Sequence, residues 1–180
     1  MPAIKRLNWG CGPLAPFGWV NSDIEAGPGI DVVADIRRGL PFPDDHFDYI
    51  VSIHVLPELA YRELDPALKE LRRVLKPGGV LRLSLPDMDL AINAYRSKDV
   101  DYFLIGDDEV KSLAGKLIVQ LLWYGRSRSM FTWEFTKELL ERCGYCDVVR
   151  SAHEKSESGL EGITELDNRA LESLFVEARK

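Results

Sequence analysis

The amino-acid sequence predicts a doubly wound α/β fold with a mostly parallel sheet. Five short apolar runs have the length and composition of buried strands, at 4–9, 19–24, 32–36, 49–55 and 80–85. A stretch with helical spacing of leucines precedes the last of these runs, so strands and helix alternate. The chain has 180 residues, of which 46% are apolar, and residues 1–180 are therefore expected to form a single domain with one substantial core.

The first strand stops at Gly10-Cys11-Gly12, a pattern typical of nucleotide-binding loops and also found in ordinary turns. Glycines let the backbone turn sharply and approach a ligand closely, with N–H groups available to it. Asp23 closes the second strand, where a carboxylate can bind a ribose diol. Eleven positions separate Gly12 from Asp23, and Pro13 and Pro16 leave no room for a normal crossover helix. The first crossover helix is therefore predicted to be shortened or absent.

The following segments predict two more strands, a helix and a fifth strand. The strand at 32–36 contains Asp35, and the strand at 49–55 carries His54 near its end. Apolar residues at helical spacing from Leu68 to Leu75 predict a helix that stops at the Pro-Gly-Gly of 77–79. The strand at 80–85 then leads into Asp87, at the strand end where open α/β sheets bind ligands.

The region after Asp87 predicts two helices separated by an acidic loop, the second with an apolar leucine face that begins at Leu113. Arg126 and Arg128 follow among aromatic residues. This segment is interpreted either as a lid over a substrate or as an ordinary contact between helices.

Four ordered blocks carry a family resemblance: Gly10 to Gly12, the acidic strand end at Asp23, ADI followed by LPFPDDHFDYI, and LRRVLKPGGVL. With them the chain resembles the class I S-adenosylmethionine-dependent methyltransferases, in particular small bacterial enzymes of that type. The resemblance implies a Rossmann-like sheet of about seven strands, with six parallel and the last antiparallel. It also implies a late helix and strand within 131–149 and a final strand near the C-terminus.

The resemblance further implies how the cofactor S-adenosylmethionine would be held. Gly10, Cys11 and Gly12 would lie against its methionine portion, and Asp23 would bind the ribose hydroxyls. Asp35 would accept from the adenine amino group, while the Ile36 N–H would donate to the neighbouring ring nitrogen. Two residues would border the methyl group, namely Ser52 and His54.

Each of these roles has a structural alternative. Asp35 would also suit an ion pair with a following arginine, and Glu25 competes with Asp23 for the ribose. His54 at a strand end is often a hydrogen-bonded structural residue. Asp87 is expected to cap the following helix more readily than to act as a base.

The implied reaction is methyl transfer to an oxygen or nitrogen of a small-molecule or glycan acceptor. A general base matters mostly for hydroxyl acceptors, with His54 the first candidate and Asp87 the second. Pro57-Glu58 stands where relatives commonly have Glu-His, so a role for that histidine does not carry over. A scaffold protein that keeps the fold without transfer is the alternative function, and a dehydrogenase is a weaker third because the third glycine is missing.

Composition excludes several other classes. The net charge of −6 argues against general nucleic-acid binding, and no apolar run approaches the roughly 20 residues of a membrane helix. Without an apolar signal core, a cytoplasmic location is expected. Three cysteines include a Cys143-x-x-Cys146 spacing with no second pair for zinc, and packing is the expected role of both residues. No metal site is predicted.

Overall fold

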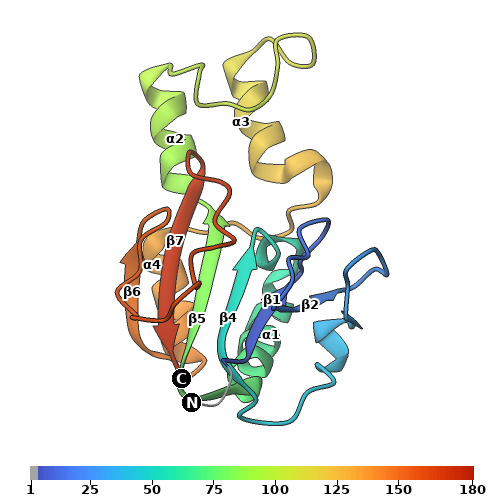
Figure 1. Ribbon diagram of the computed structural model, residues 1–180. Coiled ribbons are helices and arrows are strands. Elements are labelled where there is room, and N and C mark those ends of the chain that lie inside the picture. Colours follow the sequence, from blue (N-terminus) through green and yellow to red (C-terminus); the bar gives the residue numbers. More distant parts are fainter. Residues whose placement is uncertain (1–3) are drawn as a thin grey trace.

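The computed structural model describes residues 4–180, which form a single seven-stranded sheet with four α-helices (Figure 1). The strands lie in the order β3-β2-β1-β4-β5-β7-β6. Their bounds are β1 Arg6–Trp9, β2 Val20–Asp23, β3 Val32–Val33, β4 Phe47–Ile53, β5 Leu75–Pro86, β6 Cys146–Ser151 and β7 Ser173–Arg179. The helices are α1 Tyr61–Val74, α2 Met88–Ser97, α3 Leu113–Leu122 and α4 Trp133–Arg142.

The strand directions confirm the predicted sheet. Strands β3, β2, β1, β4 and β5 pair in parallel, and β7 pairs antiparallel with both β5 and β6. Six strands thus run in one direction and only the last is reversed. The strand order reverses between β1 and β4, where the carboxyl ends of parallel strands leave a crevice for a ligand.

The connection from β1 to β2 contains no helix, as the prolines at 13 and 16 predicted. Two buried asparagines hold this loop instead. The Asn8 side-chain amide donates to the Leu14 carbonyl at 2.8 Å, and that of Asn21 donates to the Pro16 carbonyl at 3.0 Å. Asn8 also donates to Asn21 Oδ1 at 3.0 Å, so the two side chains form one buried network.

One face of the sheet, here called the helical face, packs against α1 and α4 (Figure 1). The inward side of α1 repeats at three- and four-residue intervals, as a helix on a core requires. Its core residues are Leu64, Ala67, Leu68, Leu71 and Val74. They meet apolar side chains that alternate along β1, β4, β5 and β7, so this face holds the main core.

The helix before the fifth strand ends earlier than predicted. It stops at Val74 rather than at 77–79, because Leu75 already pairs with Phe47 of β4. The Pro-Gly-Gly sequence forms an irregular stretch inside β5, where the register against β4 shifts between Phe47 and Tyr49. The strand therefore begins five residues before the predicted position.

The opposite face, here called the loop face, is covered by residues 152–172 between β6 and β7, without a helix (Figure 1). A small apolar cluster joins this segment to the sheet through Ile163 and Leu166, which pack with Tyr49 and Val51 of β4. The Tyr49 hydroxyl also donates to the Glu161 carbonyl at 2.9 Å. The segment thus covers this face of the sheet, as crossover helices do in a fully doubly wound fold.

A buried arginine dominates the loop face. Arg82, in the middle of β5, is 0% exposed and donates through Nε to Asp167 Oδ1 at 3.0 Å and through Nη1 to Glu177 Oε1 at 2.7 Å. Its other contacts include the carbonyls of Ala152 and Lys155, both at 3.0 Å. A buried charge is tolerated only when it is paired in this way. Arg82 therefore fixes the β6–β7 segment on the sheet.

The packing role predicted for Cys143 and Cys146 is confirmed for Cys143 alone. Cys143 is buried just after α4, and the chain leaves the helix through Gly144 at φ 89°. Cys146 begins β6 and is exposed. Among residues 4–180, no cluster of three or more histidine, cysteine, aspartate or glutamate side chains is arranged to hold a metal ion. None of the helices in this part of the chain is long and apolar enough to cross a membrane.

Candidate functional site

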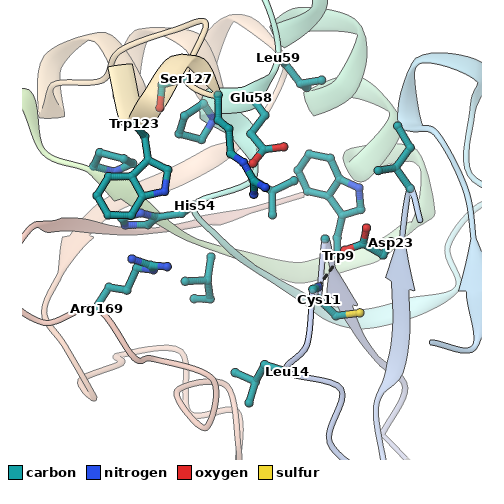
Figure 2. A pocket seen from close by; sticks show the side chains of 18 of the residues that line it. Trp9, Cys11, Leu14, Asp23, His54, Glu58, Leu59, Trp123, Ser127 and Arg169 are labelled. Carbon is teal, nitrogen blue, oxygen red and sulfur yellow. Dashed lines mark hydrogen bonds between the residues drawn. The ribbon is translucent and has the colours of Figure 1, made fainter. Parts of the chain in front are cut away.

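A cavity of about 930 Å³ opens at the carboxyl ends of β1, β2 and β4 (Figure 2). This position is the switch point of the strand order, and the volume lies at the upper end of the range for small-molecule sites. Figure 2 shows Trp9 and Asp23 on one side of the cavity and His54, Trp123 and Arg169 on the other. The lining includes most of the predicted site residues: Gly10, Cys11, Gly12, Asp23, Asp35, Ile36, His54 and Asp87.

The glycine turn is built for close packing. Gly10 has φ 70°, and a Cβ there would lie 2.2 Å from Val55 Cγ2, so no other residue fits. Gly12 has φ 53° with open space around it. Burial raises the pKa of the Cys11 thiol, which stays protonated and acts as a small wall residue.

The N–H groups of this turn point into the protein, contrary to the expectation that they face a ligand. Those of Gly10 and Cys11 donate to the Ser22 carbonyl at 2.7 and 3.1 Å, and that of Gly12 donates to Asp23 Oδ2 at 2.8 Å. Leu14 N–H donates to the Cys11 carbonyl at 3.0 Å. Pro13 has no N–H group. All the backbone donors of the cavity-lining run 10–14 therefore have acceptors within the protein, and those of Gly10, Cys11 and Gly12 join the turn to β2.

Asp23 and Glu25 both line the cavity, so either carboxylate is placed to bind a ribose. Asp23 Oδ1 accepts from the Glu25 N–H at 3.1 Å while Oδ2 holds Gly12. These bonds fix the Asp23 carboxylate, and each of its oxygens retains a second lone pair for a ligand.

Asp35 forms the ion pair given as its structural alternative, and it also lines the cavity. Its carboxylate accepts two side-chain hydrogen bonds from Arg37, each at 2.8 Å. The two residues form an ion pair at the start of the 3-10 turn Ile36–Arg38. Hydrogen bonding to Arg37 lowers the pKa of Asp35 below its ordinary value, so it is ionised. As the first residue of the turn, Ile36 has an N–H with no acceptor inside the turn. An acceptor and a donor thus lie side by side at the cavity wall.

Ser52 does not belong to the cavity lining, which corrects its predicted place beside the methyl group. It is 1% exposed inside β4, where it pairs in register with Leu83 of β5, and the cavity lining begins one residue later, at Ile53. The position along the strand explains the error, because a ligand at the carboxyl ends of the strands reaches the end of β4, whereas Ser52 lies within the strand. The Ser52 hydroxyl is buried without a hydrogen-bond partner.

His54 follows β4 and lines the cavity with its backbone at φ 56°. Its Nε2 lies 2.7 Å from Ser173 Oγ. Burial, aided by the positive charge of Arg169, lowers the pKa of His54 to about 3, so the imidazole is neutral. His54 is therefore the hydrogen-bonded histidine at a strand end that its structural alternative describes, and it also faces the cavity.

Asp87 caps α2, as the sequence favoured. Its Oδ1 accepts from the N–H groups of Asp89 and Leu90 at 2.9 and 3.3 Å, and Oδ2 accepts from Arg150 at 3.1 Å. Both oxygens are engaged in structural bonds, and the residue forms part of the wall.

The segment with Arg126 and Arg128 was interpreted either as a lid over a substrate or as a contact between helices, and its two arginines differ in this respect. Arg128 pairs with Glu63 of α1 at 3.1 Å, and its N–H donates to the Pro57 carbonyl at 2.8 Å, so it joins structural elements. Arg126, by contrast, lines the cavity, as do Pro57 and Glu58.

Trp123 belongs to the aromatic segment interpreted as a lid or a helix contact, whereas Tyr102 and Arg169 carried no recognisable sequence signal. Trp123, Tyr124 and Gly125 have successive φ values of 43°, 57° and 87°, a left-handed turn that is rare outside glycine. This turn places the Trp123 indole in the cavity, where the Arg169 guanidinium lies 5.9 Å from its ring centre (Figure 2). Burial raises the pKa of Tyr102 to about 12, which keeps its hydroxyl as a donor.

Comparison with protein families gives a match to the methyltransferase domain over residues 19–83. The ubiquinone/menaquinone biosynthesis C-methyltransferase of Pseudomonas fluorescens is 34% identical over 96 residues, covering 53% of this chain and 35% of that protein. Probable tRNA methyltransferase 9B of Mus musculus is 34% identical over 91 residues, covering 50% and 19%. The chain thus spans about a third or less of the length of these relatives.

Solved structures show the same fold over almost the whole chain. A methyltransferase from Thermotoga maritima, titled as a possible histamine N-methyltransferase, has a TM-score of 0.62 at 20% identity and covers 100% of this chain and 84% of its own. A second methyltransferase, from Archaeoglobus fulgidus, has a TM-score of 0.64 at 16% identity, with 99% and 87% covered. At these identities the likeness supports the fold alone, which agrees with the predicted Rossmann-like sheet.

Proposed function

We propose that the chain is a class I S-adenosylmethionine-dependent methyltransferase that binds S-adenosylmethionine in the 930 Å³ cavity and methylates a small acceptor there. One observation carries the proposal. Two carboxylates, Asp23 and Asp35, line the same cavity from the ends of neighbouring strands β2 and β3, as a ribose and an adenine side by side require.

The residues present fit the nucleoside part of the cofactor. Asp35 is ionised and accepts hydrogen bonds, and the Ile36 N–H beside it donates, which matches the amino group and ring nitrogen of adenine. Asp23 is held in place by Gly12 and Glu25 and accepts from ribose hydroxyls. Gly10 keeps the wall next to β4 free of side-chain atoms. When bound, the cofactor supplies a methyl group on a sulfonium, which is already an activated leaving group.

The remaining wall suits an acceptor that needs little activation. Tyr102, Trp123 and Arg126 line it, and they offer a hydroxyl donor, an aromatic surface and a cation. His54 is neutral and, with a pKa of about 3, a weak base, so it orients an acceptor by hydrogen bonding better than it removes a proton from a hydroxyl. We therefore propose a nitrogen acceptor ahead of an oxygen.

The size of the cavity favours a small molecule, or one sugar unit of a glycan, beside the cofactor. The relative from Pseudomonas fluorescens is named as a C-methyltransferase, so carbon acceptors join nitrogen and oxygen in the screen. Positioning the two reactants and excluding water are the main contributions the cavity makes.

A methyltransferase-fold scaffold without transfer is the second candidate. It is favoured by the glycine turn, whose backbone donors are all engaged within the protein. Such a protein would bind a nucleoside weakly and release no product.

Calorimetric titration with S-adenosylmethionine tests the proposal. We expect binding by the wild type, and a loss of about tenfold or more in Asp23→Ala and in Asp35→Ala, because each removes a charged acceptor of a ligand hydrogen bond. Asp101→Ala, outside the cavity, is the matched control and keeps wild-type affinity. Equal affinity in all four proteins would contradict the proposed site. Release of S-adenosylhomocysteine with any acceptor separates the enzyme from the scaffold.

A further inference from the structure

We propose that Arg169 binds the α-carboxylate of the cofactor, taking the place of the absent first crossover helix. The inference rests on the proposed function and adds to it a residue outside every predicted motif. Arg169 comes from the β6–β7 segment, which reaches the cavity from the loop face.

A carboxylate in this cavity needs a positive partner. A helix after β1 would present unpaired N–H groups and the positive end of its dipole, but residues 10–19 form no helix. Each N–H in the lining run 10–14 already has an acceptor within the protein, and Pro13 has none to give. The cofactor carboxylate must therefore be bound by a side chain rather than by the backbone of the turn.

The turn itself offers no cation, since residues 10–18 contain neither lysine nor arginine. Within residues 4–180, the arginines that line the cavity are Arg37, Arg126 and Arg169, and no lysine lines it. Arg37 is paired with Asp35 through two bonds of 2.8 Å and lies at the adenine end. Arg126 follows the left-handed turn after α3, on the wall proposed for the acceptor.

Arg169 lies beside the end of β4, across the cavity from Trp9 and Asp23 (Figure 2). Figure 2 shows it next to His54, and the following residue, Val55, is the one that packs against Gly10. The methionine portion is expected along Gly10 to Gly12, so a cation beside the end of β4 is within the same part of the cavity. Arg169 is the cavity arginine that meets this condition.

The β6–β7 segment holds Arg169 firmly enough for this role. Asp167, two residues earlier, is fully buried in its ion pair with Arg82. Glu165 pairs with Arg6 at 3.0 Å and accepts from the Trp19 indole at 3.2 Å. The residues that follow these anchors, Asn168 and Arg169, line the cavity. The buried Arg82–Asp167 pair and the partly exposed Arg6–Glu165 pair thus position a ligand-binding side chain.

Glu172 completes the arrangement. It lines the cavity, is almost fully buried, and lies 3.4 Å from Arg169. An arginine and a glutamate side by side complement the carboxylate and ammonium of an amino-acid zwitterion without adding net charge to the cavity. The guanidinium has five donors, of which this contact engages one, so donors remain for a carboxylate.

Two ligands that differ only in the carboxylate test the inference: S-adenosylmethionine and its decarboxylated form. Calorimetric titration of the wild type is expected to show tighter binding of S-adenosylmethionine. In Arg169→Ala, binding of S-adenosylmethionine falls about 10- to 100-fold, while binding of the decarboxylated ligand changes less than about twofold. Arg169→Lys restores part of the difference, because the charge returns without the planar fork.

Arg126→Ala is the matched control, since it removes another cavity arginine and is expected to keep the wild-type ratio of the two affinities. Equal losses for both ligands in Arg169→Ala, or an unchanged ratio, would overturn the role of Arg169 while leaving the proposed function intact. A wild-type protein that binds neither ligand would overturn both. Far-ultraviolet circular dichroism checks that each variant is folded.

Discussion

The two faces of the sheet are closed by different physical means. On the helical face, α1 and α4 bury apolar side chains against alternate residues of β1, β4, β5 and β7. On the loop face, the β6–β7 segment adds a small apolar cluster and relies on the buried ion pairs of Arg82. Burial of apolar surface is non-directional, whereas an ion pair fixes a segment in one register. The face without helices is therefore held by contacts that also aim specific residues at the cavity.

Removing the charge at the centre of the loop face is expected to have the largest effect on stability. Arg82→Met leaves Asp167 and Glu177 buried without their partner and should lower the free energy of unfolding by about 3–5 kcal/mol. Urea unfolding measures the change. Arg62→Met, on the surface of α1, is the control and stays within about 0.5 kcal/mol. A loss below about 1 kcal/mol in Arg82→Met would show that the loop face does not depend on this charge.

Filling the glycine turn comes next. Gly10→Ala forces a Cβ into Val55 at a residue with φ 70°, so we expect a loss of about 2–4 kcal/mol from overpacking and left-handed strain together. Gly12→Ala has the same kind of φ with open space, and about 1–2 kcal/mol is expected there. Thermal and urea unfolding compare the two. Equal losses would mean that contact with Val55 contributes nothing.

The asparagine network that holds the β1–β2 loop is expected to contribute less to stability. Asn8→Ala removes the donors to the Leu14 carbonyl and to Asn21 Oδ1, and about 1–3 kcal/mol is expected. Asn93→Ala, at an exposed site on α2, serves as the control. Increased protease cleavage within 13–18 should accompany the loss. Unchanged stability and unchanged cleavage would assign the hold on this loop to other contacts.

The pH dependence of stability is the smallest of these effects when it is expressed per pH unit. The pKa of His54 is about 3 in the folded protein and about 6.5 when unfolded, so between these values the unfolded state binds the extra proton. Stability should therefore fall as pH decreases from about 6.5 towards 3, by up to about 1.4 kcal/mol per pH unit from this group. His54→Asn, which tolerates the positive φ, should lose that part of the slope. Urea unfolding at several pH values shows whether the two slopes differ, and equal slopes would contradict the shift.

The sequence predicted the helical face well, and it marked two acidic strand ends that line the cavity. Apolar spacing in α1 and the acidic strand ends at Asp23 and Asp35 are local patterns, and the structure brings both carboxylates to one cavity. The prolines at 13 and 16 correctly predicted a connection without a helix. Ser52 was misplaced because the composition of a strand does not show which of its last residues reach the cavity and which stay buried inside the sheet.

The loop face was not predictable in the same way. An arginine inside the apolar strand LRLSL was a visible signal, but its partner Asp167 lies 85 residues away with no local pattern linking them. Arg169 and Glu172 belong to a segment with no regular secondary structure, so no periodicity marks their side chains as facing a cavity. Long-range ion pairs, rather than local propensity, decide this part of the fold.

Hydrogen exchange with and without S-adenosylhomocysteine tests most directly the claim that the loop face helps to build the cofactor site. We expect slower exchange not only at the glycine turn and around Asp23 and Asp35, but also in the β6–β7 segment around Asn168 and Arg169. Protection confined to the strand ends, with the β6–β7 segment exchanging as in the free protein, would contradict it.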